Sequence, residues 1–191
     1  MRTGPVIGYL LLSAVLLLTA SCATGGALYK DQNMDFSAIK TVAVLPFENL
    51  SRDNLGAERV RDVFSTELLA TGAMYVLPQG EVARGLSRAG ITNQSAPSPE
   101  EIVKICGIIK ADAVITGVVK EYGEVRSANS AANIISISVQ LTEGQTGRVV
   151  WSARSTRGGV SVWDRLFGGG GLPMEQVTEQ AVNDLIDQLF K

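Results

Sequence analysis

The first 21 residues have the pattern of a secretion signal, and this pattern decides which part of the chain remains to fold. Arg2 provides a basic start, an apolar run extends from Val6 to Leu18, and the small residues 19–21 follow. A basic start, an apolar segment of about 7–15 residues and a small-residue cleavage site are the three parts of a signal peptide. We therefore expect residues 1–21 to be a signal peptide.

Cys22 follows the small residues directly and makes the signal more specific. The sequence Leu18-Thr19-Ala20-Ser21-Cys22 resembles a bacterial lipobox, in which the cysteine thiol is lipidated and becomes the new amino terminus. The resemblance implies lipid attachment at Cys22, and two or more acyl chains give stable membrane anchoring. Two alternatives remain open. One is plain secretion, because Thr19 stands where leucine is commonest; the other is an uncleaved membrane helix, for which the run is shorter than the usual span of about 20 residues.

The composition of the remaining chain excludes several classes of function. Removal of the signal leaves 191 − 21 = 170 residues, enough for one domain with a substantial core. The loss of Arg2 changes 17 basic residues to 16 against 19 acidic ones, so nothing in the charge balance favours nucleic acid. The chain has no histidine and two cysteines, which argues against zinc or haem clusters and histidine-dependent nucleophiles. We expect no enzymatic activity, no metal and no cofactor.

Hydrophobic periodicity predicts an α/β (α+β) fold with a mixed sheet of about five strands and helices packed on it. The clearest strand is 134–141, where Ile, Val and Leu alternate with Ser and Gln. The clearest helix start is Ser98-Pro99-Glu100-Glu101, a capping box with proline at the first helical position. The expected order is β-α-β-α-α-β-β-β-α, with strands at 41–45, 74–77, 112–121, 134–141 and 148–155, and helices at 56–70, 79–88, from 99 onward and at 174–190.

The domain organisation follows from these elements. We expect a signal peptide at 1–21, a lipid-attached tether at 22–39 and a single α/β envelope domain at 40–191. The tether is expected because residues 23–36 contain Gly25-Gly26 and show no strong periodicity. Cys106 lies on an apolar helical stripe and is expected to be a small buried hydrophobic residue without a disulfide partner.

Three segments carry a resemblance to a known superfamily. They are Val42–Asn49 (VAVLPFEN), Ala111–Gly117 (ADAVITG) and Val149–Ser152 (VVWS). They resemble the bacterial envelope proteins that include the amino-terminal domain of TolB, CsgG and LpoB, across about residues 40–190. The resemblance implies a mixed α/β domain, often held on a lipid anchor, that acts by binding other proteins or copies of itself.

One apolar segment bracketed by glycines is a candidate contact site. Trp163, Leu166 and Phe167 share a face at helical spacing within residues 158–171. Flanking glycines tolerate most backbone angles, so this segment has the pattern of a flap that presents an aromatic anchor to a partner or to lipid headgroups. The alternative is a helical turn packed on the sheet. The carboxylates Asp112 and Glu121 are candidates for a shared cleft, but we interpret both as solvated surface groups.

These observations predict a lipid-anchored envelope lipoprotein that works as a protein-binding or assembly module, an accessory factor or activator. Its expected partners are membrane lipid through acylated Cys22, envelope proteins, a possible second copy of itself, and no nucleic acid. Ala23 follows the lipidated cysteine, where an aspartate would stand for inner-membrane retention; by resemblance to the sorting rules of Gram-negative bacteria this implies the outer membrane, with the domain facing the periplasm. The rival hypothesis is a self-assembling, CsgG-like secretion ring component, which charges in the neighbouring strands, such as Lys120 and Arg154, disfavour.

Overall fold

The computed structural model of the chain describes residues 28–127, 130–159 and 171–191. The strands in these ranges are β1 (Leu28–Lys30), β2 (Thr41–Val44), β3 (Glu48–Asn49), β4 (Tyr75–Val76), β5 (Ala113–Ser127), β6 (Ser130–Glu143) and β7 (Val149–Gly158). The helices are the short 3-10 helix η1 (Phe36–Ala38), α2 (Gly56–Ala70), α3 (Gln79–Ala89), α4 (Pro99–Ile109) and α6 (Met174–Phe190).

The strands form one mixed sheet, which confirms the expected fold class. Its order is β1-β7-β6-β5-β2-β4, and β3 pairs with β5 beyond the end of β2. The β2–β4, β2–β5 and β3–β5 pairs are parallel, whereas the β5–β6, β6–β7 and β7–β1 pairs are antiparallel. All nine expected elements are present in the expected order, and β1 and β3 are additional.

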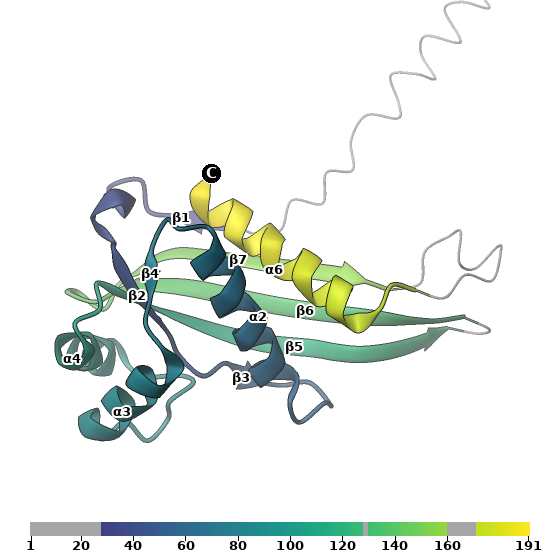
Figure 1. Cartoon of the computed structure of the whole chain (residues 1–191), viewed down its shortest axis with the longest axis horizontal. Helices are drawn as coiled ribbons and strands as arrows, with labels where there is room; N and C mark the ends of the chain where they lie inside the picture. Colours follow the sequence, from purple (N-terminus) through teal and green to yellow (C-terminus); the bar gives the residue numbers. More distant parts are fainter. Residues whose placement is uncertain (1–27, 128–129, 160–170) are drawn as a thin grey trace, which may run out of the picture.

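Helices α2 and α6 cover one face of this sheet and form the larger core with it (Figure 1). The inward residues of β6 are fully buried at Ile135, Ile137, Val139 and Leu141. Trp151 on β7 is also buried, and its Nε1–H donates to the carbonyl of Gln188 on α6 at 3.3 Å. The apolar stripe of α6 and the alternation of β6 therefore meet as the periodicities predict.

Helices α3 and α4 pack on the opposite face, at the β2 end of the sheet, and form a second core. The capping box at Ser98 is confirmed: its Oγ accepts from the Glu101 N–H at 3.3 Å, and Glu101 Oε2 accepts from the Ser98 N–H at 2.8 Å. Cys106 is buried in this core, as expected, and burial raises the pKa of its thiol to about 12. A thiol in this state is an unreactive apolar group.

The apolar residues at positions 60, 63, 64, 68 and 69 predict one buried face for the helix over 56–70, and one of them departs from it. Leu69 is 54% exposed, whereas Val60, Phe64 and Leu68 are fully buried. Those three residues repeat at spacings of four, and Leu69 lies about 100° further round the helix than Leu68. The buried stripe of α2 is therefore narrower than the sequence suggested.

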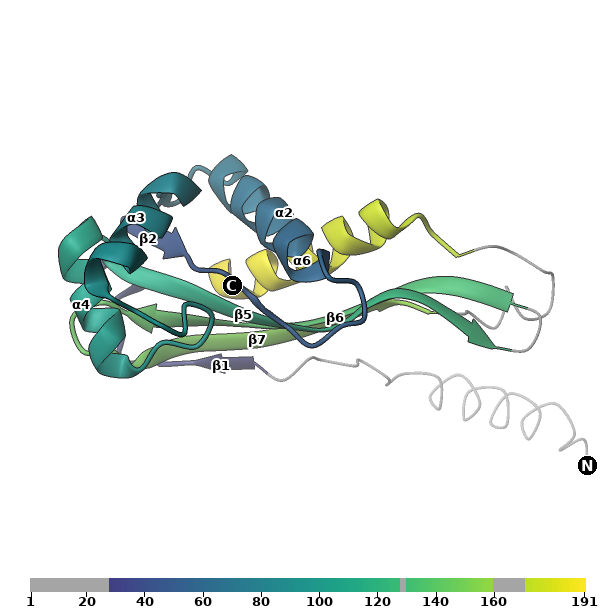
Figure 2. The ribbon, with the colours of Figure 1, turned by 90° about the horizontal axis from the view of Figure 1, so that it is seen from below.

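Strands β5 and β6 continue past the rest of the sheet as a long hairpin (Figure 2). Their pairing runs to Ser127 opposite Ser130, whereas β7 ends with Gly158 opposite Ile134. The register shifts at Lys120, a β-bulge that increases the local twist. The expected strand bounds, 112–121 and 134–141, missed this extension.

Strand β1 lies inside the stretch that was expected to be a tether. Leu28 pairs with Ala153 and Lys30 with Trp151, at the outer edge of β7. The Asp31 N–H donates to the Val150 carbonyl at 2.8 Å, and Lys30 Nζ donates to the Leu189 carbonyl at 3.3 Å. Three residues are too few to show a periodicity, so only the pairing with β7 identifies this strand.

Candidate interaction surface

The face of β5, β6 and β7 opposite α2 and α6 is the candidate surface, and we call it the open face. Its side chains are polar, with the exception of Val118, and comprise Thr116, Val118, Ser136, Ser138, Gln140, Ser152, Arg154 and Thr156. None of these eight side chains is fully buried. The Ser136 and Thr156 hydroxyls lie 3.1 Å apart and share a hydrogen bond. Within the described ranges, the cover over this face is confined to its α4 end.

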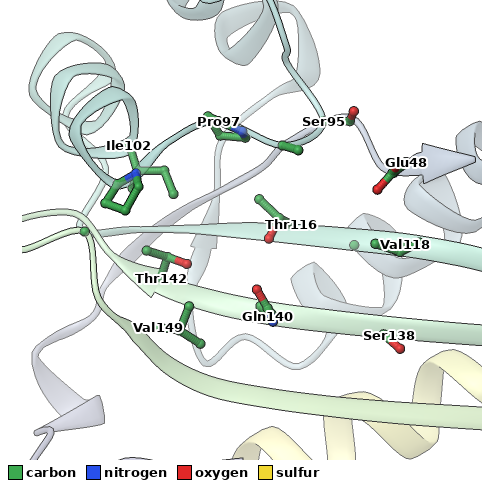
Figure 3. Close-up of a pocket in the computed structure, with 14 residues that line it drawn as sticks. Glu48, Ser95, Pro97, Ile102, Thr116, Val118, Ser138, Gln140, Thr142 and Val149 are labelled. Atoms are coloured by element: carbon green, nitrogen blue, oxygen red, sulfur yellow. The ribbon is translucent and has the colours of Figure 1, made fainter.

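A roofed pocket of about 280 Å³ lies at that end of the open face (Figure 3). Ser95, Pro97 and Ile102, from the α3–α4 connection and from α4, line its upper side. The strands supply its floor, which includes Thr116, Val118, Ser138, Gln140, Thr142 and Val149. Glu48 at the start of β3 brings one carboxylate to the rim.

The roof is held in place by the beginning of α4 and by one glycine. The Ser98 capping box fixes the first turn of α4 and therefore the segment that precedes it. Gly147, in the β6–β7 turn, has φ +68°, and a Cβ there would lie 2.6 Å from the Pro99 carbonyl oxygen. Only glycine permits both this conformation and this approach. The turn and the roof are thus locked together at the end of the pocket.

The pocket combines apolar walls with hydroxyl and amide groups on its floor. Pro97, Ile102 and Val149 are apolar, while Thr116 and Gln140 offer hydrogen-bond donors and acceptors. This is the composition of a site that takes an apolar side chain and holds its backbone by polar contacts. The described residues contain no group of three or more His, Cys, Asp or Glu side chains placed to hold a metal ion.

The two carboxylates considered for a shared cleft are not brought together. Asp112 Oδ2 accepts from the backbone N–H groups of Lys40 and Thr41 at 2.9 and 2.8 Å, so this group ties β5 to the start of β2. Glu121 is exposed beyond the β-bulge, nine residues further along, about 30 Å away in an extended strand. Asp112 therefore has a structural role, and neither carboxylate lines the pocket.

The residues proposed for contacts from the sequence lie outside the described ranges. Cys22, Trp163, Leu166 and Phe167 all fall there and stay predictions. No helix in the described part of the chain is long and apolar enough to cross a membrane.

The pocket itself was missed by the sequence analysis. The alternation of β6 marked Ser136, Ser138 and Gln140 as outward, which was the one available signal. The roof comes from residues about 40 positions earlier in the chain, and no local pattern indicates that it folds over these strands.

Comparisons with known proteins identify the family. The family described as "Putative lipoprotein GNA1162-like" matches residues 30–191. The chain belongs to this family. It is also 28% identical over 189 residues to the protein named "Putative lipoprotein NMB1124/NMB1162" of Neisseria meningitidis serogroup B, a match that covers 94% of this chain and 83% of that one.

Solved structures share the fold. Lipoprotein GNA1162 from Neisseria meningitidis superposes with a TM-score of 0.58 at 21% identity, covering 78% of this chain and 97% of that one. A PelC dodecamer subunit from Paraburkholderia phytofirmans gives 0.58 at 18% identity, covering 86% and 97%. The LpoB C-terminal domain from Salmonella enterica gives 0.50 at 16% identity, covering 66% and 86%. The resemblance to the LpoB superfamily stated from the sequence is thereby confirmed at the level of fold.

Proposed function

We propose that this protein is a lipid-anchored lipoprotein of the outer membrane, facing the periplasm, that acts by binding other envelope proteins. Its membership of a lipoprotein family and the lipobox-like sequence before Cys22 support the anchor. On this proposal the domain is an accessory factor or activator of an envelope complex, and it carries out no chemistry of its own.

The open face with its roofed pocket is the observation that carries the protein-binding role. A sheet face of an isolated domain is commonly covered by helices or by a second sheet. Here the face presents hydroxyls and amides beside an apolar pocket, which suits an extended partner segment with one anchoring side chain. The absence of histidine from the whole sequence supports binding over catalysis.

The anchor is tested by metabolic labelling with radioactive palmitate in cells that produce the full chain. We expect the wild-type protein to incorporate label and Cys22→Ser to incorporate none, because the acylated thiol is removed. Cys106→Ser is the matched control: it also removes one cysteine but should keep the label, since Cys106 is buried in the folded domain. Equal labelling of wild type and Cys22→Ser would contradict the attachment site.

The protein contact is tested by placing a photo-crosslinking amino acid at Gln140 in the open face. A second position, Thr66 on the exposed side of α2, serves as the control. We expect illumination of cells to yield a discrete adduct from position 140 and none from position 66. Adducts of equal strength at both positions, or none at position 140, would contradict the assignment of the open face.

A second candidate is a self-assembling ring. The fold it shares with a PelC subunit, whose crystal structure is a dodecamer, favours this candidate. Light scattering on a sizing column separates the two, with the full-length lipidated protein in mild detergent. A closed oligomer of many copies would support the ring, because rings bury large surfaces between like subunits. A monomer or dimer would support the tethered accessory factor.

A further inference from the structure

A second hollow lies at the outer edge of β7, and we call it the edge groove. It measures about 780 Å³ and is lined by Leu28, Lys120, Ser136, Ser138, Arg154, Ser155, Thr156, Arg157, Asp184 and Gln188. Strand β1 pairs with β7 only between Trp151 and Ala153, whereas β7 continues to Gly158. Among the described residues, no strand pairs with the outer edge of β7 from Arg154 to Gly158. One end of the groove therefore lies at Leu28, the residue of β1 that is nearest in the chain to Cys22.

The free charge in the edge groove is positive. Arg157 donates to both oxygens of Asp184, with Nη2 at 2.5 Å from Oδ1, and Ser155 Oγ donates to Oδ2 at 2.9 Å. This carboxylate is thus fully occupied within the domain. Lys120 and Arg154 make no ion pair within the described ranges.

The groove also offers hydroxyl groups beside these two cations. Ser136, Ser138 and Thr156 line the same hollow on the open face. Cationic groups together with hydroxyls are the donors that bind phosphate oxygens. Glu121 lies opposite Ser136 in the register and brings one negative charge to the neighbouring part of this face.

The length of the tether places this groove close to the membrane. Five residues separate Cys22 from Leu28, which makes six residue-to-residue steps, so the acylated end lies within about 20 Å of Leu28 even when the chain is fully extended. In the register, Leu28 is opposite Ala153 and Ala153 is opposite Val139. The hairpin end at Ser130 is nine residues from Val139, or about 30 Å along the strand.

These two lengths exclude an upright orientation on the hairpin. With the hairpin end toward the bilayer, about 10 Å of a two-stranded ribbon that carries Glu124 and Arg126 would have to enter the membrane, with strand edges unpaired. With the opposite end of the sheet toward the bilayer, the short tether would have to reverse direction, because Leu28 is the end of β1 nearer the hairpin. If the domain instead lies with its β1–β7 edge on the bilayer, the tether need be neither fully extended nor reversed in direction.

The side chains at this edge suit the membrane surface. Leu28 and Tyr29 on β1 are 50% and 49% exposed. Tyrosine is enriched at the level of lipid headgroups, where its ring is apolar and its hydroxyl is hydrated. The exposed cations of the groove lie on the same edge, beside Leu28.

We propose that the edge groove binds the anionic phospholipid headgroups of the membrane in which Cys22 is anchored, so that the domain lies with its β1–β7 edge on the bilayer. The headgroup phosphate accepts from Lys120, Arg154 and the neighbouring hydroxyls, while Leu28 and Tyr29 contact the glycerol region. This inference rests on the proposed lipid attachment. It assigns the end of the open face nearest the tether to lipid and leaves the roofed pocket free for a protein.

The test uses the purified, acylated full-length protein in vesicles, with single cysteines that carry a fluorescent label. One variant has Ser152→Cys on β7, opposite Tyr29 at the β1–β7 edge and outside the groove lining, and the control has Ser87→Cys on α3, which packs against β2, four strands from β1. Cys106 is buried and Cys22 is acylated, so neither takes the label. Quenching by a lipid-headgroup quencher is compared in phosphatidylglycerol–phosphatidylcholine vesicles and in phosphatidylcholine alone.

We expect quenching at position 152 to exceed quenching at position 87 by at least about twofold in the anionic vesicles, because both groove cations lie at the surface. The double variant Lys120→Gln/Arg154→Gln should reduce the quenching at position 152 to its level in phosphatidylcholine and leave position 87 unchanged. If the protein floats with the vesicles but both positions are quenched equally, lipid binding by the edge groove is contradicted. Quenching at position 152 that changes neither with phosphatidylglycerol nor with the double variant also contradicts it. A protein that fails to float contradicts the anchor at Cys22, and the tether argument with it.

Discussion

The two faces of strands β5, β6 and β7 differ completely, although they are built from alternating residues of the same chain segments. On the helix face of β6, Ile135, Ile137, Val139 and Leu141 are fully buried under α6. The residues that alternate with them, Ser136, Ser138 and Gln140, lie on the open face, and none of the three is buried. The period of two thus lets one strand hold the fold with one set of side chains and present a surface with the other. Stability and binding should therefore respond to different substitutions.

The largest effect should come from neighbouring truncations on opposite faces of β6. Ile137→Ala removes a fully buried side chain and should lower the free energy of unfolding by about 2–5 kcal/mol, because a cavity is left. Ser138→Ala, one residue away on the open face, should change it by no more than about 0.5 kcal/mol. Urea unfolding of both variants measures the difference. Similar losses for the two would mean that the open face is part of the core.

Loss of the helix cap in the roof over the open face should lower the free energy of unfolding by less than Ile137→Ala and by more than Ser138→Ala. Ser98→Ala removes the side-chain cap of α4 and should cost about 1 kcal/mol of unfolding free energy. Ser98→Asp keeps a capping oxygen and serves as the matched control, with a much smaller loss expected. Hydrogen exchange of the amides in the first turn of α4 should increase in the alanine variant alone. Unchanged exchange in that turn would show that packing of Pro99 and Ile102, and not the cap, holds the roof.

Local patterns predicted the elements whose cause is local. The capping box at Ser98 and the apolar stripe over 174–190 specify their helices through neighbouring residues, and α6 begins and ends at the expected positions. The alternation over 134–141 likewise predicted both faces of β6. These signals need no knowledge of what lies across the sheet.

Elements that depend on partners distant in the chain were missed for the same reason. Strand β1 exists because three residues pair with β7, more than 120 positions away, and β3 because two residues pair with β5. The hairpin beyond Glu121 contains Gly123 and two charged residues, Glu124 and Arg126, so it lacks the apolar alternation that marks a half-buried strand. The roofed pocket and the edge groove combine residues from several such elements, and the sequence indicated neither one.

The ion pair on the helix-face side of the edge groove should make a smaller contribution to the free energy of unfolding. Hydrogen bonds from Arg157 and then Ser155 hold the pKa of the Asp184 carboxyl below its ordinary value of 3.8. Because this folded pKa is lower than the unfolded one, the contribution to stability is present above about pH 4 and is lost as the pH falls through the folded value. The pair is partly exposed to solvent, so we expect about 0.5–1 kcal/mol. The stability difference between wild type and Asp184→Asn, followed by urea unfolding from about pH 7 to about pH 3, should shrink at the acid end.

The smallest effect on stability should come from the cations Lys120 and Arg154 of the edge groove. Lys120→Gln/Arg154→Gln removes two exposed cations that make no ion pair within the described ranges, and the unfolding free energy should stay within about 0.5 kcal/mol of wild type. The same double variant is expected to abolish the preference of the edge groove for anionic lipid. Arg157→Gln/Asp184→Asn, on the other side of β7, should do the reverse: it removes the ion pair without changing the net charge of the groove and lowers stability, while Lys120 and Arg154 remain available to lipid. Thermal unfolding and vesicle quenching on the two variants test whether the two sides of β7 separate stability from binding. Loss of both properties in Lys120→Gln/Arg154→Gln would show that these cations stabilise the fold, and the division between the faces would then fail at this edge.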